Sequence, residues 1–205
     1  FLYAKKSPVG ICHAFYSKNQ IWIEGIRIDH IFRRQKIASS LIKHAESIGR
    51  EKHISSSYML IDTENSSSLS MAKSLDYEIF QTWNFYSLLP HSNSNHHVTF
   101  EKSLDPKKYP QFVKSWRWIP FDSHILSTFY EKNQILKSDV DGDVSTAILT
   151  DSEHFDNTLI VTLFSNSHDS TLQIISFLQN HAIEKNYERI QILSKEKLPV
   201  FNSLE

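Results

Sequence analysis

Residues 26–40, IRIDHIFRRQKIASS, are the stretch that decides how the first part of this chain folds. They open with the end of an apolar strand, residues 20–30, whose side chains alternate between two faces. The basic turn Arg33-Arg34-Gln35-Lys36 follows, and residues 37–52 then place four apolar residues at helical spacing: Ile37, Leu41, Ala45 and Ile48. The sequence therefore predicts a strand, a basic turn and a helix in direct succession.

The junction between this turn and the helix has the features of an anion site. The first N–H groups of a helix lack intrahelical partners and lie at the positive end of its dipole. Arg33, Arg34 and Lys36 add positive charge, and the small residues Ala38 and Ser39 let a ligand approach the backbone. These features favour a bound phosphate or pyrophosphate, with a solvated basic loop as the alternative.

Composition narrows the function classes. The 205 residues include 22 Lys and Arg against 23 Asp and Glu, which argues against nucleic-acid binding through bulk charge but leaves a local basic patch open. Four glycines are too few for a Rossmann fingerprint or a P-loop, and one cysteine excludes an intramolecular disulfide. No apolar run approaches roughly 18 residues and no secretory pattern opens the chain, so we expect a cytoplasmic protein without membrane contact.

Three other features favour structural roles over metal or redox chemistry. His91, His96 and His97 lack acidic or cysteine partners at fixed spacing, and residues 139–143, DVDGD, lack the spacing of a calcium loop. We interpret the first as a polar linker and the second as a tight turn, and we expect no metal site. Cys12 lies in a strand pattern and is interpreted as a small core residue.

The segment 26–40 resembles the acetyl-CoA signature of the GNAT N-acetyltransferase superfamily, (Q/R)-x-x-G-x-(G/A). Arg33-Arg34-Gln35-Lys36-Ile37-Ala38 stands at that pattern, and Ile26-Arg27-Ile28 is similar to the family strand before it. A second family motif has an Asn, a small residue three positions later, and an aromatic residue preceded by Gly. The matching residues here are Asn65, Ser68, Asp76 and Tyr77. The resemblance covers roughly residues 9–89.

This resemblance implies an acetyl-CoA-dependent N-acetyltransferase and a set of cofactor contacts. The backbone of Ile26 and Ile28 would pair with the pantetheine arm and the acyl carbonyl, which requires a strand edge that its neighbour leaves free. Backbone amides in residues 34–39 would hold the pyrophosphate, and Asn65 would contact the arm. The implied cofactor-binding residues are Ile26, Arg27, Ile28, Arg33, Arg34, Gln35, Lys36, Ile37, Ala38, Ser39, Asn65 and Ser68.

Two residues are candidates for the catalytic step. Period-two alternation predicts that Glu24 shares a strand face with Ile26 and Ile28, where a carboxylate could accept a proton from an incoming ammonium. A solvent-facing carboxylate, or one paired with a nearby arginine, is the alternative. Tyr86 is a candidate proton donor, with packing as its alternative. The acceptor would be an amine-bearing small molecule or peptide of unknown identity, and the oligomeric state is not readable from the sequence.

The chain departs from the family pattern in three ways. Lys36 stands where the family usually has Gly; we expect it to keep an ordinary backbone conformation and to weaken the grip on phosphate. Ala72 stands where many family enzymes carry the Tyr that protonates the leaving thiolate, although a thiolate is a tolerable leaving group without an acid. The family domain also starts with a strand and two acceptor-binding helices, so we expect the full protein to have an earlier segment.

The second half of the chain repeats part of the first. A strand–helix–strand pattern at residues 21–28, 37–52 and 58–61 recurs at 158–164, 170–185 and 189–193, with His-Ala pairs at matching helix positions. Duplication and chance similarity of helix composition both explain this. Residues 165–170, SNSHDS, replace the basic turn without Lys or Arg, so a duplicated second half would have lost the cofactor site.

These observations predict an α/β protein with a mixed sheet flanked by helices, in two GNAT-like units. We assign residues 1–90 to the acetyl-CoA-binding domain and 91–205 to a smaller, degenerate GNAT-like domain, with the polar residues 90–97 as the linker. A non-catalytic acyl-CoA-binding sensor of the same fold is the main alternative function. A phosphate-binding patch for RNA or protein, made by Arg33, Arg34 and Lys36, is a third hypothesis.

Overall fold

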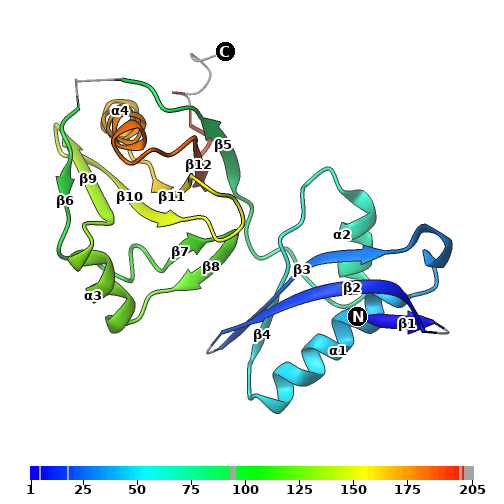
Figure 1. Cartoon of the computed structure of the whole chain (residues 1–205). Helices are drawn as coiled ribbons and strands as arrows, with labels where there is room; N and C mark the ends of the chain where they lie inside the picture. The colour runs from blue at the N-terminus through cyan, green and yellow to red at the C-terminus, as the bar shows by residue number, and fades with distance from the viewer. Residues whose placement is uncertain (5, 18, 93–95, 199, 201–205) are drawn as a thin grey trace. The chain divides into compact units, whose positions relative to one another are not determined.

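The structure is a computed structural model, and it describes the chain except for residues 5, 18, 93–95, 199 and 201–205. The chain divides into two compact units, Phe1–Phe80 and Gln81–Glu205 (Figure 1). The sequence placed this boundary at residue 90 and expected a smaller second unit, whereas the second unit is the larger. The strand β5 (Asn84–Leu88) causes the difference, because it pairs with a strand of the second sheet. A β-rich composition does not reveal which sheet a strand joins.

The first unit is a four-stranded sheet with two helices on one face. The strand order is β1-β2-β3-β4, with antiparallel pairs except for the parallel pair β3–β4. Its elements are β1 (Leu2–Ala4), β2 (Ser7–Tyr16), β3 (Gln20–Ile28), η1 (His30–Phe32), α1 (Ile37–Glu51), β4 (Ser56–Tyr58) and α2 (Ser66–Lys73). Ile42 and Ala45 of α1 form the core with Ile21 and Ile23 of β3, and Met71 of α2 packs against the same cluster.

Two glycines let α1 lie close to the sheet. A Cβ atom on Gly49 of α1 would meet Ile21 Cδ1 at 2.1 Å, and one on Gly10 of β2 would meet Ile28 Cδ1 at 2.8 Å. Atoms packed at native density leave no room for these extra carbons without displacing the neighbour. The approach at Gly10 holds the start of α1 beside the end of β3, because Ile37 and Leu41 of α1 meet the same position.

A β-bulge interrupts β3 at Gly25. The register with β2 changes from His13↔Glu24 to Ile11↔Arg27, so β3 contributes one more residue than its partner over this step. Gly25 has φ of 62°, a left-handed conformation that suits glycine and is typical of this kind of bulge.

The bulge reverses the predicted faces in the second half of β3. Ile26 packs against the core that contains Ile21 and Ile23, and Ile28 also points toward α1. Glu24 therefore lies on the opposite face. The prediction that Glu24 shares a face with Ile26 and Ile28 was wrong, because one inserted residue exchanges the faces of all residues after it.

The second unit is a six-stranded sheet with an apolar core on each face. The strand order is β5-β12-β11-β10-β9-β6, and β11–β12 is the one parallel pair among these described strands. Its further elements are β6 (Thr99–Phe100), β7 (Gln111–Lys114), β8 (Arg117–Pro120), α3 (Ser123–Glu131), β9 (Ile135–Val140), β10 (Asp143–Asp151), β11 (Thr158–Phe164), α4 (His168–Glu184) and β12 (Arg189–Ser194). α4 covers one face, and α3 with the β7–β8 hairpin covers the other (Figure 1).

The repeat expected from the sequence is present and is longer than expected. β9, β10, β11, α4 and β12 follow the same order along the chain as β1, β2, β3, α1 and β4. The two sets also share spatial order and strand direction, with two antiparallel pairs and then a parallel pair joined by the helix. This agreement over five elements supports duplication over similar helix composition.

The structure contains the expected tight turn at residues 139–143, but it does not place a linker at residues 90–97. Asp141 and Gly142 form the turn between β9 and β10 with φ of 53° and 89°, and the Gly142 N–H donates to Asp139 Oδ1. No group of three or more His, Cys, Asp or Glu side chains among the described residues could hold a metal ion. Cys12 packs beside the first unit's core. The expected linker, 90–97, belongs to the second unit, and its residues 93–95 lie outside the described residues.

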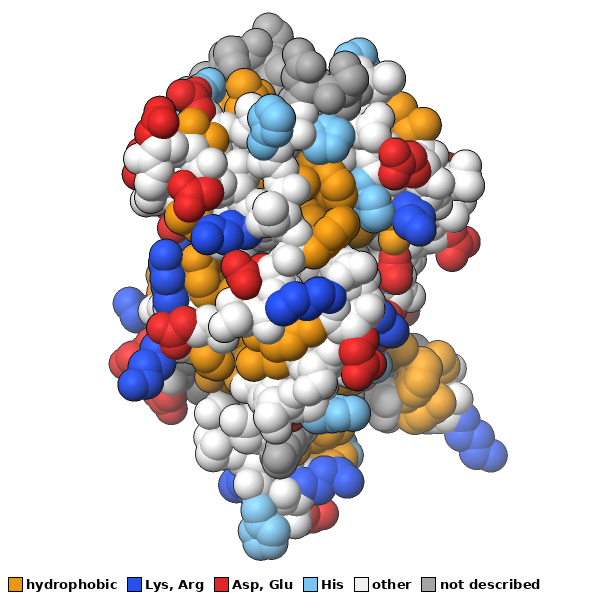
Figure 2. All heavy atoms as spheres, turned by 90° about the vertical axis from the view of Figure 1, so that its left-hand side faces the viewer, with side chains coloured by type: hydrophobic (Ala, Val, Ile, Leu, Met, Phe, Trp, Pro, Cys, Tyr) orange, Lys and Arg blue, Asp and Glu red, His pale blue; other side chains and the backbone are white. Residues whose placement is uncertain are grey.

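The second unit presents apolar side chains between histidines over α4 (Figure 2). Leu172 and Ile183 of α4 and Phe100 of β6 are each exposed, and the rings of Phe177 and His181 stack at 5.4 Å between centroids.

No helix in the described part of the chain combines the length and apolar character needed to cross a membrane.

A charged cluster ties the β7–β8 hairpin to the loop after β10. The side chain of Arg117 is 4% exposed, and its Nη1 lies 3.1 Å from Glu153 Oε2. Lys114 Nζ lies 3.0 Å from the other oxygen, and the Glu153 N–H donates to the buried Ser115 hydroxyl. The Lys114 hydrogen bond and charge, with Arg117, lower the pKa of Glu153 although burial opposes the shift.

This lowered pKa predicts how the cluster responds to acid. Because the folded pKa of Glu153 lies below its unfolded value of about 4.3, its contribution is complete above that value and is lost as the pH falls through the folded pKa. We expect Glu153→Gln to lower stability by about 1 kcal/mol at pH 7, since the side chains of Lys114 and Glu153 are both about half exposed and solvent screens their attraction. Urea unfolding between pH 7 and 3 should show the gap between variant and wild type closing. A constant gap would contradict this assignment.

Candidate functional site

β3 has a free edge over its second half. β4 pairs with β3 over Gln20↔Ser56, Ile21↔Ser57 and Trp22↔Tyr58 only. Beyond Trp22, β3 continues for six residues and pairs with β2 alone within the described structure. The Trp22 and Tyr58 rings stack at 5.1 Å at the point of divergence. The expected splayed strand edge is therefore present, and within the described structure no strand pairs with the side of residues 23–28 that faces away from β2.

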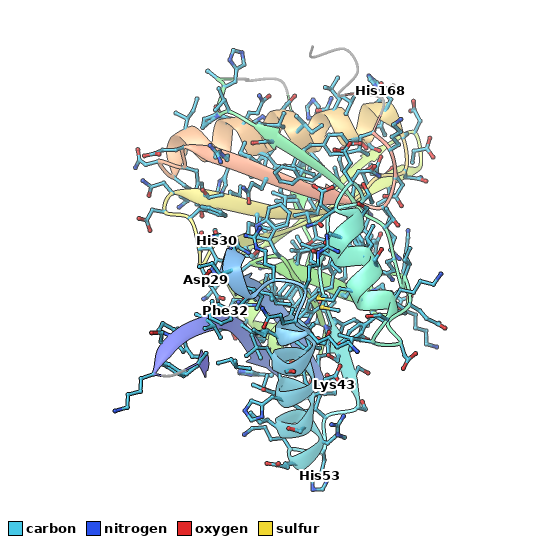
Figure 3. The ribbon with its side chains drawn as sticks, turned by 90° about the vertical axis from the view of Figure 1, so that its right-hand side faces the viewer. Asp29, His30, Phe32, Lys43, His53 and His168 are labelled. Carbon is cyan, nitrogen blue, oxygen red and sulfur yellow. The ribbon has the colours of Figure 1, made fainter. Side chains whose placement is uncertain are left out.

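The start of α1 lies just beyond this edge. Residues 29–36 connect β3 to α1 through η1, and Asp29 Oδ1 accepts a hydrogen bond from the Ile31 N–H. Lys36 is the N-cap of α1 and makes no side-chain cap hydrogen bond. Side chains cap the other described α-helices, α2, α3 and α4. Figure 3 shows Asp29, His30 and Phe32 near the start of α1 and His53 beyond its opposite end.

Cations surround this uncapped helix start. Arg34 and Lys36 are exposed, and their side chains make no ion pair or hydrogen bond within the described residues. Arg33 Nε donates to the Ile28 carbonyl at 3.3 Å, and Gln35 Nε2 donates to a carbonyl of η1. An anion at this position would meet backbone N–H groups, the helix dipole and at least two uncompensated positive charges.

Two arginines use carbonyls that the resemblance assigns to the cofactor arm. Arg27 Nη1 donates to the Ile26 carbonyl at 3.0 Å, as Arg33 does to Ile28. Both side chains are exposed, so these hydrogen bonds are exchangeable with water or with a ligand amide. The expected contacts at Ile26 and Ile28 therefore require these arginines to release the carbonyls.

Glu24 forms a close pair with a histidine on the neighbouring strand. Its Oε1 lies 2.7 Å from His13 Nδ1, and the side chain is 28% exposed. Glu24 ends the regular part of β3, directly before the bulge at Gly25 and within the strand half that β4 leaves free. The paired residue is His13, not the arginine that the sequence offered as an alternative partner.

The second motif has a structural role in this chain. Asn65 Oδ1 accepts a hydrogen bond from the Ser68 N–H at 3.1 Å, so Asn65 is the N-cap of α2. Capping uses the carbonyl oxygen of the amide and leaves the NH₂ group for other partners. Ala72 is buried in α2 and supplies no hydroxyl.

Tyr86 lies in the second unit and packs there. It belongs to β5, its ring contacts the main core of that unit, and its hydroxyl accepts a hydrogen bond from the Leu198 N–H at 2.9 Å. These contacts agree with the packing alternative for Tyr86. The prediction of catalysis assumed that residues 84–88 belong to the first sheet, which the pairing with β12 contradicts.

The sequence did not predict a hydrogen-bond network that joins Tyr77 to Glu46 and Ser57. The Tyr77 hydroxyl donates to Glu46 Oε1 of α1 at 2.6 Å and lies 2.6 Å from Ser57 Oγ of β4. Burial, followed by the Glu46 hydrogen bond, raises the pKa of Tyr77 well above its usual range. The network joins α1, β4 and the segment after α2 near the point where β4 leaves β3. No sequence periodicity connects these three residues.

Removing the Tyr77 hydroxyl tests this network. We expect Tyr77→Phe to lower the free energy of unfolding by about 1–2 kcal/mol, because Glu46 and Ser57 lose a partly buried partner. Tyr3→Phe is the matched control, since Tyr3 is exposed and its hydroxyl makes no hydrogen bond within the described residues. Urea unfolding of both variants measures the difference, and equal stability would show that the network contributes nothing.

Residues 1–77 match the family model described as Acetyltransferase (GNAT) family. The first unit is a GNAT acetyltransferase domain. No curated protein sequence matches the chain. The structure of a proposed acetyltransferase from Thermoplasma acidophilum has a TM-score of 0.62 and 14% identity, covering 95% of this chain and 68% of its own. A GCN5-related N-acetyltransferase from Sphaerobacter thermophilus has a TM-score of 0.58 and 10% identity, covering 90% and 67%.

A tandem GNAT protein from the clavulanic acid biosynthesis pathway covers 98% of this chain and 75% of its own, with a TM-score of 0.49 and 8% identity. Sequence identities this low show similarity of fold and do not indicate which substrate is used. The structures from Thermoplasma and Sphaerobacter show that single chains contain the fold of nearly the whole of this chain.

The GNAT domain keeps the glycine conformation at two positions where the family pattern has Gly. Lys36 has φ of 61° and ψ of 15°, and Asp76 has φ of 63°. The expectation that Lys36 adopts an ordinary backbone conformation was wrong. The left-handed region costs a lysine roughly 1–2 kcal/mol, which the packing of α1 on the sheet must offset. Lys36 and Asp76 therefore adopt a backbone conformation that glycine permits without strain, and Lys36 adds a positive charge to the loop.

Proposed function

We propose that the first unit is an acetyl-CoA-dependent N-acetyltransferase that acts on an amine acceptor by direct attack. The observation that carries the proposal is the free edge of β3 ending beside the uncapped, cationic start of α1. A strand edge suits an amide-containing arm, and the helix start suits a diphosphate. Coenzyme A joins these two chemical groups in one molecule, so the residues present fit this group.

Two sets of groups would hold coenzyme A, one for its pantetheine arm and one for its diphosphate. The backbone groups of residues 23–28 would pair with the pantetheine arm, after Arg27 and Arg33 release the Ile26 and Ile28 carbonyls. The N–H groups at the start of α1, with Arg34 and Lys36, would hold the diphosphate. Arg27 and Arg33 are then free to join the phosphates, which would place four cations along the site.

Glu24 is the proposed general base. It would accept a proton from the acceptor ammonium, directly or through water, while His13 holds the carboxylate in place. The amine nitrogen would then attack the thioester carbonyl carbon, the carbon–sulfur bond would break, and coenzyme A would leave as the thiolate, which takes up, directly or through water, the second proton that the nitrogen loses as the amide forms. Holding both substrates on one sheet edge makes the step effectively unimolecular. Backbone N–H groups of β3 would polarise the carbonyl oxygen.

A non-catalytic acyl-CoA sensor is the second candidate, and Ala72 favours it. This buried methyl group stands where many family enzymes place a tyrosine hydroxyl. A sensor would bind the thioester through the same edge and loop without turnover. A patch that binds nucleic acid phosphates through Arg33, Arg34 and Lys36 is less well supported, because it does not use the free β3 edge.

Calorimetry with acetyl-CoA, followed by detection of released thiol across a panel of amines, separates these candidates. Saturable binding and acceptor-dependent release of coenzyme A support the enzyme. Binding without release for any amine supports the sensor. Absence of acetyl-CoA binding, with salt-dependent binding of nucleic acid that coenzyme A does not compete with, would favour the phosphate patch.

A further inference from the structure

The second unit contains an equivalent of the β3 edge, but that edge is closed. β11 and β12 correspond to β3 and β4 by order and direction. Their pairing runs without interruption from Thr158↔Arg189 to Leu163↔Ser194, six consecutive pairs, where β3 and β4 make three. No stretch of β11 is therefore left for an amide-containing arm.

The helix start is closed as well. Three residues, Ser165, Asn166 and Ser167, connect β11 to α4, whereas residues 29–36 connect β3 to α1. Ser167 Oγ accepts a hydrogen bond from the Ser170 N–H and so caps α4. No lysine or arginine lies in this connection, and His168 is the first residue of α4 (Figure 3).

The hydroxyl groups next to this cap form hydrogen bonds with one another. Ser145 Oγ lies 2.7 Å from Ser170 Oγ and 3.1 Å from Thr171 Oγ1, and Ser165 Oγ lies 2.7 Å from the same Thr171 oxygen. Ser145, Ser170 and Thr171 are all buried. The polar groups at the start of α4 thus have internal partners, whereas no side chain caps the start of α1.

The segment that follows β12 covers the remaining space beside the start of α4. After β12, Leu198 and Val200 are each 2% exposed and join the main core of the second unit. The Leu198 N–H donates to Tyr86 Oη at 2.9 Å, and Ser194 Oγ donates to Glu196 Oε2 at 2.8 Å. The space between this segment and the start of α4 is a cavity of about 200 Å³, lined by Ser165, Asn166, Ser167, His168, Thr171, Glu196, Lys197, Leu198 and Val200. Sites for drug-sized ligands measure roughly 300–1,000 Å³.

We propose that residues 195–198 and Val200 are a built-in occupant of the second unit's cofactor-equivalent groove, so that this unit takes no acyl-CoA and each chain binds one molecule. The inference rests on the proposed function of the first unit. It gives Tyr86 a definite role as the acceptor that anchors the Leu198 backbone. It also explains why the connection at 165–167 contains no cation.

Stoichiometry tests the first part of the inference. Calorimetry of the full chain with acetyl-CoA should give one molecule per chain, and Arg34→Glu with Lys36→Glu should leave no residual saturable binding. Two molecules per chain, or residual binding in the double variant, would overturn the inference while leaving the proposed function intact. Failure of the wild type to bind at all would instead refute the proposed function.

Thermal unfolding tests the occupant without any ligand. We expect Leu198→Ala to lower the melting temperature by roughly 10 °C, because it removes a fully packed side chain. Lys197→Ala, one residue away and exposed, is the control and should melt as the wild type does. Tyr86→Phe should lower the melting temperature by a few degrees. An unchanged melting temperature in Leu198→Ala, or a loss of turnover in Tyr86→Phe without a change in melting, would overturn the assignment.

Discussion

Replacing Arg34 and Lys36 together by glutamate is expected to weaken acetyl-CoA binding by at least about 100-fold. Each residue offers a charge-assisted hydrogen bond to phosphate worth about 1.5–3 kcal/mol, and 1.4 kcal/mol corresponds to tenfold in affinity. The two side chains have no competing partner within the described residues, so the whole interaction is available to a ligand. Glutamates at the same positions would add repulsion. Calorimetry at two salt concentrations measures the loss and its screening.

The matched control lies at the other end of the same helix. Arg50→Glu with Lys52→Glu makes the same change in net charge on exposed residues. The 15 residues of α1 separate the two sites by about 22 Å, more than twice the Debye length at physiological salt. We expect this variant to bind acetyl-CoA within a few-fold of the wild type. Equal losses in both double variants would mean that net charge, and not the loop, governs binding.

Lys36→Gly separates the charge of the loop from its shape. Glycine removes the ammonium group and adopts φ of 61° without strain, so the backbone N–H groups keep their positions. We expect a loss of about tenfold in affinity, since one of the two charge-assisted hydrogen bonds is removed and no repulsion is added, against at least about 100-fold in the double charge reversal. If Lys36→Gly lost as much affinity as the double charge reversal, the lysine charge would account for most of the binding free energy.

Local patterns predicted the elements of the site, and tertiary contacts decided their details. The alternation in residues 20–28 and the helical spacing after residue 37 predicted β3 and α1 because these signals come from burial on one face. The left-handed backbone of Lys36 had no such signal, since residue type alone favours an ordinary conformation. The residue next to Lys36, Ile37, packs against β2 at Gly10, and such a contact between distant residues leaves no local pattern.

Gly25 shows a signal that was present but misread. Isolated glycine inside a strand pattern is typical of a bulge, and a bulge inverts the faces after it. Reading Gly25 in this way would have placed Ile26 in the core and Glu24 on the opposite face. The partner of residues 84–88 had no comparable signal, because the hydrogen bonds of β5 to β12 join residues about 100 positions apart.

Replacing Glu24 by glutamine is expected to lower kcat by about 100-fold at neutral pH with little change in KM for acetyl-CoA. An amide has nearly the same shape as the carboxylate and still reaches His13, but it cannot accept a proton from an ammonium group. General base catalysis typically contributes 10²–10⁴-fold, so 100-fold is the low end of that range. Steady-state kinetics with the best amine of the panel measures the effect, and Glu51→Gln on the exposed end of α1 is the control.

The pH profile distinguishes a base from a merely structural carboxylate. Above the pKa of the acceptor amine itself, the attacking nitrogen is already deprotonated in solution and needs no base. The gap between wild type and Glu24→Gln should therefore narrow as the pH rises toward that value. A structural defect would lower kcat by the same factor at every pH, because it would misplace the acceptor whatever its protonation. A constant gap, or full activity in the variant at neutral pH, would remove Glu24 from the mechanism and leave proximity and the β3 backbone to account for the rate.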